Sequence, residues 1–204
     1  MENRATRLFL VRHGEVTNHK GEFRYNGHID VELSCLGLSQ MKAVADRLAA
    51  ESIKGVYSSD LVRTMRGASA IADKHGISPV ADARLKEVAA GRWEGLTFNE
   101  VHERFPDESH VRFEDLVNYR IKEGGESLRD VAARVIPALN EIVSRHSGEG
   151  AVIVAHGGVN RVILCHALNL PLENFFRLEQ DYGCLNIIDF YESTALVRLV
   201  NGIL

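Results

Sequence analysis

The chain has 204 residues, of which 45% are hydrophobic and 25% are charged. This balance is typical of a globular protein with a complete core and excludes a disordered or membrane-embedded chain. The formal net charge of -4 at pH 7 argues against nucleic-acid binding, because proteins that follow a phosphate backbone present a basic face. We therefore expect neither a nucleic-acid partner nor a membrane partner.

The cysteines and the start of the chain indicate the compartment. Cys35, Cys165 and Cys184 are an odd number without a Cys-x-x-Cys spacing, which favours neither a disulfide framework nor a zinc ribbon. A reducing compartment fits this pattern best. The charged residues at the start lead directly into a short apolar run, which is too short for a signal peptide or a membrane span. We expect a cytoplasmic protein.

The first predicted element is a buried strand over residues 8–12, which Gly14 ends because glycine permits a sharp turn. His13 then stands at the carboxyl end of the strand, beside the permanently charged Arg12. In parallel sheets this edge is where ligands bind, so the two residues form a candidate site. A surface turn is the alternative.

A helix and then a strand–helix unit follow. Ser34 is the expected N-cap of a helix with one apolar face, formed by Met41, Val44, Ala45 and Leu48. Residues 55–58 predict a second strand, and Asp60 is the expected cap of a helix over residues 61–75. Arg63 lies in the first turn of that helix, where a cation and free backbone N–H groups together form an anion site.

A weak third strand over residues 80–85 leads to Glu87. Residues 89–123 change the pattern and predict an insertion that covers the edge of the sheet, with short helices of which one is capped by Thr97. After this insertion, Ser127 caps a long amphipathic helix.

The strongest strand pattern covers residues 151–155 and, like the first strand, it ends on a histidine followed by glycine, here His156 and Gly157. A helix over residues 159–169 and two final strands complete the pattern. The alternation of strands and helices predicts an α/β fold with a largely parallel sheet. Residues 1–204 are expected to form one domain.

The residues that this fold would bring together suit phosphoryl transfer. If the two strands are neighbours, His13 and His156 face one crevice. Arg12 and Arg63 would lie beside them, with Glu87 at the rim. Arginine forks bind phosphate oxygens, a neutral imidazole attacks phosphorus, and a carboxylic acid protonates the departing alkoxide. Structural turn histidines or a metal site are the alternatives, but the arginines would repel a divalent cation.

Five segments follow one another over nearly the whole chain: 10–15 (LVRHGE), 58–63 (SSDLVR), Glu87, 125–127 (GES) and 155–158 (AHGG). Together they resemble the histidine phosphatase superfamily, also called phosphoglycerate-mutase-like. The resemblance implies a three-layer α/β/α sandwich with a largely parallel central sheet and a small helical cap at about residues 89–123. It also implies a phosphoric monoester hydrolase that uses no cofactor and no metal.

By this resemblance His13 is the phosphorylated nucleophile and Glu87 is the proton donor and acceptor. The implied phosphate pocket consists of Arg12, Asn18, Arg63, His156 and Gly157. The sequence departs from the family here, because Val16 replaces the usual threonine and the asparagine comes one position early. Thr17 is therefore an alternative to Asn18 as the donor in the pocket.

Three functions remain open at this point. A phosphatase is favoured over a phosphoglycerate mutase, because the chain has no Arg-Arg pair and only a short stretch between Glu87 and His156. A catalytically silent phospholigand-binding domain is the third function. Segments 25–34 and 155–161 resemble α-ribazole phosphatases of cobalamin synthesis, which suggests α-ribazole 5′-phosphate as the substrate. We expect a small-molecule phosphate ester as the partner and leave a homodimer open.

Overall fold

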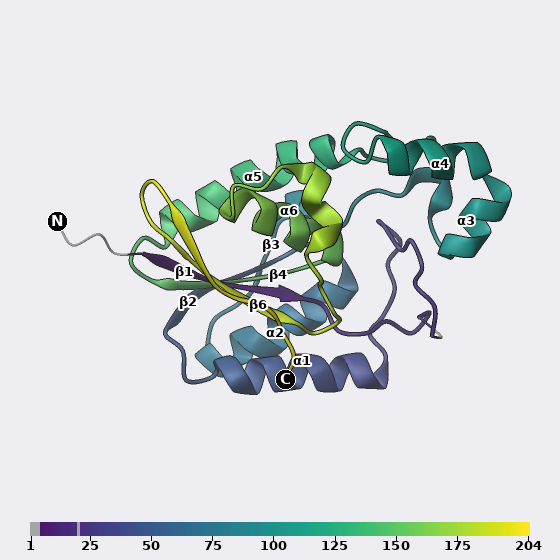
Figure 1. Ribbon diagram of the computed structural model, residues 1–204. Helices are drawn as coiled ribbons and strands as arrows, with labels where there is room; N and C mark the ends of the chain where they lie inside the picture. Colours follow the sequence, from purple (N-terminus) through teal and green to yellow (C-terminus); the bar gives the residue numbers. More distant parts are fainter. Residues whose placement is uncertain (1–4, 20) are drawn as a thin grey trace.

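A computed structural model describes residues 5–19 and 21–204. One sheet contains six strands in the order β3-β2-β4-β1-β5-β6 (Figure 1). The strands are β1 (Thr6–Arg12), β2 (Ile53–Ser58), β3 (Val80–Ala81), β4 (Gly150–Ala155), β5 (Leu185–Phe190) and β6 (Ala195–Gly202). Strands β3, β2, β4 and β1 are parallel, whereas β5 and β6 are antiparallel to their neighbours. β1 and β4 therefore occupy the centre of the sheet.

Helices cover both faces of this sheet (Figure 1). On one face lie α1 (Cys35–Leu48) and α2 (Val62–His75), and on the other lie α5 (Leu128–Arg145) and α6 (Gly157–Ala167). The remaining helices are α3 (Phe98–Arg104), α4 (Pro106–Glu114), and the short η1 (Ala83–Leu85), η2 (Gly91–Trp93) and η3 (Leu172–Arg177). The predicted three-layer α/β/α sandwich with a largely parallel sheet is confirmed. Within the described residues, no helix has the length and apolarity to cross a membrane.

Side chains of β1 alternate between two cores, because successive residues of a strand point to opposite faces. Leu8 and Leu10 join the cluster that contains the apolar faces of α5 and α6, whereas Phe9 and Val11 join that of α1 and α2. All six residues of β4 are buried. This is the pattern of a central parallel strand with both faces covered, and it fixes the positions of the residues that follow β1 and β4.

The cap predicted at Asp60 is wrong. Helix α2 begins at Val62, whose N–H donates to the carboxylate of Asp30 at 2.8 Å. Asp60 instead forms an ion pair with Lys86 at 3.0 Å. The partner of the helix end is therefore a loop residue distant in sequence, which local capping rules do not find.

Helix α6 begins at Gly157, two residues before the predicted start at residue 159. Only His156 separates β4 from this helix, and it has extended dihedral angles. Gly157 and Gly158 therefore belong to the first turn, whose N–H groups have no partner within the helix. The early start places these N–H groups at the carboxyl edge of the sheet.

The turn after β1 passes very close to α1. A Cβ atom on Gly14 would overlap the backbone of Gly37, and one on Gly37 would overlap the backbone of Glu15. Backbone atoms cannot move aside as a flexible side chain can, so only glycine fits at these two positions. The close approach fixes the chain immediately after His13.

The segment predicted as an insertion, residues 89–123, contains η2, α3 and α4, which extend to one side of the sheet (Figure 1). We call this segment the cap. It has a small core of its own, formed by Ala90, Trp93, Val101 and Ile121. The predicted cap, Thr97, starts α3 and forms a capping box with Glu100.

Candidate active site

His13 follows β1 directly, at the carboxyl end of the central strand pair. Its backbone N–H donates to the carbonyl of Ala155 at 3.0 Å, which continues the pairing of β1 with β4. The ring nitrogen Nδ1 lies 2.7 Å from the carbonyl oxygen of Gly14. Because a carbonyl oxygen only accepts, Nδ1 carries the proton and the lone pair is on Nε2.

His156 occupies the corresponding position after β4. The two rings meet edge to face, with centroids 5.1 Å apart. Nε2 of His156 lies 2.8 Å from Oγ of Ser59, whereas Nδ1 is buried and has no hydrogen-bond partner among the described residues. The structure therefore brings together the two histidines that end similar strands in the sequence.

Both imidazoles are neutral at neutral pH. Burial lowers the pKa of His13 well below its usual value of 6.5, and the positive charges of Arg63 and Arg12 lower it further. Burial, and then the same two arginines and His13, lower the pKa of His156. A neutral ring is the form in which an imidazole nitrogen can act as a nucleophile.

Two arginines stand beside the rings, each held by backbone carbonyls. Nη1 and Nη2 of Arg63 donate to the carbonyls of Ile29 at 2.7 Å and Gly27 at 2.8 Å. Nη1 of Arg12 donates to the carbonyl of Gln180 at 2.5 Å. In both arginines Nε is buried and has no hydrogen-bond partner among residues 5–19 and 21–204. A buried donor without a partner costs free energy, which an acceptor on a ligand would recover.

Glu87 reaches the same edge from the loop after η1. Its Oε1 accepts the N–H of Val88 at 2.9 Å, and its Oε2 accepts the N–H of Gly158 at 3.1 Å. Gly158 belongs to the first turn of α6, where the helix dipole favours a negative charge. A Cβ atom at Gly158 would overlap the carboxylate, so glycine is needed for this contact.

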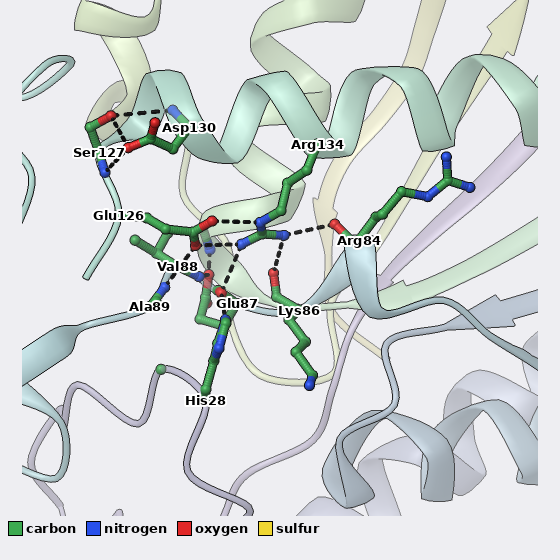
Figure 2. Close-up of polar contacts among 12 residues, drawn as sticks. His28, Arg84, Lys86, Glu87, Val88, Ala89, Glu126, Ser127, Asp130 and Arg134 are labelled. Carbon is green, nitrogen blue, oxygen red and sulfur yellow. Dashed lines mark hydrogen bonds and ion pairs between the residues drawn. The ribbon is translucent and has the colours of Figure 1, made fainter. Parts of the chain in front are cut away.

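Arg134 of α5 holds the loop that carries Glu87 (Figure 2). Its Nη1 donates to the carbonyls of Arg84 at 2.7 Å and Lys86 at 2.8 Å. Its Nη2 donates to the carbonyl of Glu87 at 2.9 Å. One guanidinium therefore fixes three backbone carbonyls within four residues of the loop. The sequence does not indicate this role, because all three partners are backbone groups far away along the chain.

Glu126 fixes Arg134 from the opposite side (Figure 2). Nε and Nη2 of Arg134 donate to the two carboxylate oxygens of Glu126 at 2.8 and 2.7 Å. The same carboxylate accepts the N–H of Ala89 at 3.0 Å. Nε2 of His28 lies 2.9 Å from the carbonyl oxygen of Glu87. Bonds from several elements therefore hold the loop on both sides of Glu87.

The site opens into a cavity of about 410 Å³. Of the predicted site residues, those that line this cavity are Arg12, His13, Arg63, Glu87 and Gly157. His156 is fully buried next to His13 and is not part of the wall.

The two alternative pocket donors, Asn18 and Thr17, do not line the cavity either. Thr17 is exposed, and the amide of Asn18 donates at 2.7 Å to that of Asn26, whose residue does line the cavity. The loop geometry thus puts Asn26 at the wall and Asn18 beyond it. No group of three or more His, Cys, Asp or Glu side chains that could hold a metal ion occurs in the described part of the chain.

The sequence matches a family model over almost its whole length. The family is the histidine phosphatase superfamily, branch 1, and the match covers residues 8–202. The chain belongs to the histidine phosphatase superfamily. The predicted enzyme class, a phosphoric monoester hydrolase of this superfamily, is confirmed.

Relatives of this histidine phosphatase include enzymes with named substrates. It is 35% identical over 179 residues to glucosyl-3-phosphoglycerate phosphatase of Mycolicibacterium vanbaalenii, which covers 84% of this chain and 78% of the relative. It is 32% identical over 196 residues to phosphoserine phosphatase 1 of Hydrogenobacter thermophilus, which covers 96% and 92% of the two chains.

Solved structures show the same fold. A mycobacterial glucosyl-3-phosphoglycerate phosphatase matches with a TM-score of 0.86 and 29% identity, over 98% of this chain and 100% of the other. The α-ribazole phosphatase of Shigella flexneri matches with a TM-score of 0.86 and 24% identity, over 97% and 96%. At that identity the second likeness shows the fold alone.

The lowered pKa of His13 sets the pH dependence expected of this histidine phosphatase. We predict that neutral His13 is the reactive form, so that activity is lost as pH falls through its pKa and the acid limb of kcat/KM lies below the usual value of 6.5. Arg12→Gln removes a positive charge and should move this limb to higher pH, whereas Arg12→Lys should not. Profiles of the three proteins on one substrate test this, and coincident limbs for the two variants would contradict it.

Proposed function

We propose that the chain is a cofactor-independent phosphomonoesterase that hydrolyses a small phosphorylated metabolite through phospho-His13. The observation that carries this proposal is a set of three buried nitrogens around the neutral His13 that have no hydrogen-bond partner in the described part of the chain. They are Nε of Arg12, Nε of Arg63 and Nδ1 of His156. A phosphoryl group offers the negative charge and the acceptor oxygens that such donors require.

In the first step the lone pair on Nε2 of His13 attacks phosphorus, and the bond from phosphorus to the ester oxygen breaks. The proton on Nδ1 stays with the ring and its bond to the Gly14 carbonyl keeps the ring oriented. Glu87 acts as the proton donor in this step, and its proton passes to the departing alkoxide. The products of this step are the alcohol and a phosphohistidine, with Glu87 ionised.

In the second step a water molecule attacks the phosphorus of the phosphohistidine. The carboxylate of Glu87 takes one proton from this water, and the phosphorus–nitrogen bond breaks with its electron pair returning to Nε2 of His13. Inorganic phosphate leaves, and Glu87 is again protonated. Arg12, Arg63 and His156 stabilise the charge on the phosphoryl oxygens in both steps.

The substrate test is turnover of small phosphomonoesters by the purified protein without added cofactor. We expect release of inorganic phosphate from p-nitrophenyl phosphate and from members of a panel that includes α-ribazole 5′-phosphate, phosphoserine and 3-phosphoglycerate. Isomerisation of phosphoglycerate that depends on 2,3-bisphosphoglycerate would instead assign a mutase. Binding of these compounds without any turnover would assign a silent phospholigand-binding domain.

A further inference from the structure

The cavity that contains the catalytic groups continues beneath the cap. Its far wall is largely apolar and includes Phe23, Tyr25, Trp93, Leu116 and Ile121. A single cation of the cap helices, Arg112 of α4, also lines this wall. The part of a substrate that does not carry the reacting phosphate must therefore lie against apolar surface and near the guanidinium of Arg112.

Arg112 differs from the other cations of the cap, which have carboxylate partners. Arg92 and Lys122 both pair with Glu108, and Arg120 pairs with Asp130. Within residues 5–19 and 21–204, Arg112 forms no ion pair, and one of its Nη atoms donates to the carbonyl of Leu116.

The position of Arg112 makes this lack of a partner costly. Burial lowers the pKa of Arg112, which reflects the cost of keeping its charge away from water. Arg112 is half-buried, and Asp115 acts on it through its charge without forming an ion pair. A partly desolvated cation without an ion-pair partner is stabilised when an anion binds to it. The cap end of the cavity is therefore a place where an anionic group of a ligand would be held.

A second donor at the same end also lacks a partner. Trp93 is 1% exposed and lines the cavity, and its Nε1 has no hydrogen-bond partner among the described residues. The Tyr25 ring packs edge to face on Trp93, with centroids 5.5 Å apart. An indole N–H can only donate, so it requires an acceptor, as Arg112 does.

Apart from Arg12 and Arg63 at the catalytic end, the other two arginines that line the cavity already contact carboxylates. Arg24 lies 3.4 Å from a carboxylate oxygen of Glu100, and Arg161 lies 3.5 Å from one of Glu179. Binding of a second phosphate group at the cap end would require two or more cations without ion-pair partners, as at the catalytic end. One planar guanidinium fork matches one carboxylate.

We propose that the substrate of this site is a phosphorylated carboxylic acid, whose carboxylate is bound by Arg112 and by the indole N–H of Trp93 while its phosphate lies at His13. This inference rests on the proposed phosphatase function and names its substrate class. Arg112 is then a specificity residue that touches the substrate but takes no part in bond breaking. Compounds with a neutral group in place of the carboxylate leave the cation unpaired and are poor substrates.

The test uses pairs of substrates that differ in the carboxylate. One pair is 3-phosphoglycerate and glycerol 3-phosphate, and the other is phosphoserine and phosphoethanolamine. We expect the wild-type protein to prefer the carboxylate member of each pair by about 10-fold or more in kcat/KM. Arg112→Met should remove most of this preference, chiefly through a higher KM for the carboxylate members. Arg112→Lys keeps the charge without the fork and should retain part of it.

Arg104→Met is the matched control, because Arg104 is exposed on α3 and its substitution should leave the ratio within each pair unchanged. Equal kcat/KM for the two members of both pairs in the wild type overturns the inference, and so does an unchanged preference in Arg112→Met. Failure of the phosphatase proposal looks different, because p-nitrophenyl phosphate would then not be hydrolysed. Calorimetric affinities of the His13→Ala variant for the same pairs test the carboxylate preference without turnover.

Discussion

His13→Ala is expected to lower kcat/KM for every phosphomonoester by about 10⁴-fold or more, because removal of a nucleophile removes the covalent route completely. Nε2 of His13 carries the free lone pair of the ring, because Nδ1 carries the proton and donates a hydrogen bond to the Gly14 carbonyl. The neighbouring histidine cannot take its place, because His156 is fully buried and its Nε2 is engaged with Ser59. Steady-state rates on p-nitrophenyl phosphate measure the loss.

The same variant should also lose the covalent intermediate. After a short reaction with a radiolabelled phosphate ester, denatured wild-type protein should carry an acid-labile, alkali-stable label, and His13→Ala should carry none. His102→Ala is the control, because His102 is an exposed residue of the cap. Full activity in His13→Ala, with a thermal unfolding midpoint near that of the wild type, would refute the assignment.

Glu87→Gln is expected to lower kcat on alkyl phosphates by about 10² to 10⁴-fold, the usual contribution of a general acid. An amide cannot protonate a departing alkoxide, and alkoxides are poor leaving groups. Gln has nearly the same shape, and its carbonyl oxygen can still accept the N–H of Gly158. The loss should therefore reflect the missing proton and not a displaced loop.

The choice of leaving group distinguishes the loss of the proton donor from a displacement of the loop. p-Nitrophenolate departs without a proton, so Glu87→Gln should reduce the first step on p-nitrophenyl phosphate far less than on an alkyl phosphate. Single-turnover measurements isolate this step from the later attack of water, which also uses Glu87. Glu103→Gln, an exposed substitution on α3, should alter neither substrate. Equal losses on both substrates in Glu87→Gln would contradict the role of proton donor.

The centre of the fold could be predicted because it depends on local pattern. β1 and β4 are apolar runs that end on histidine and glycine, and their pairing in the sheet brings His13 and His156 together. The helix caps at Ser34 and Ser127 could also be predicted, since each side chain accepts a hydrogen bond from the backbone N–H three residues later. The orientation of β5 and β6 was not predicted, because strand pattern does not encode direction.

The parts that failed depend on contacts between distant segments. The cap of α2 comes from Asp30 and not from the adjacent Asp60, because the preceding loop folds back onto the helix. The family resemblance assigned Asn18 to the phosphate pocket, and this role stays a prediction. Its amide is bonded to Asn26, which lines the cavity. The role of Arg134 could not be predicted, because its guanidinium binds backbone carbonyls, which every residue possesses.

The two histidines and the cap lie in parts of the molecule that differ in local stability, because β1 and β4 are at the centre of the sheet. His13 and His156 follow strands that have neighbours on both sides, whereas the cap relies on a core of four buried residues. Amide exchange in such a molecule begins in the weakly packed unit and reaches the central strands last. We therefore expect substitutions in the cap to alter which ester is accepted while the reaction centre stays intact. A chain built in this way can acquire a new substrate without first losing its chemistry.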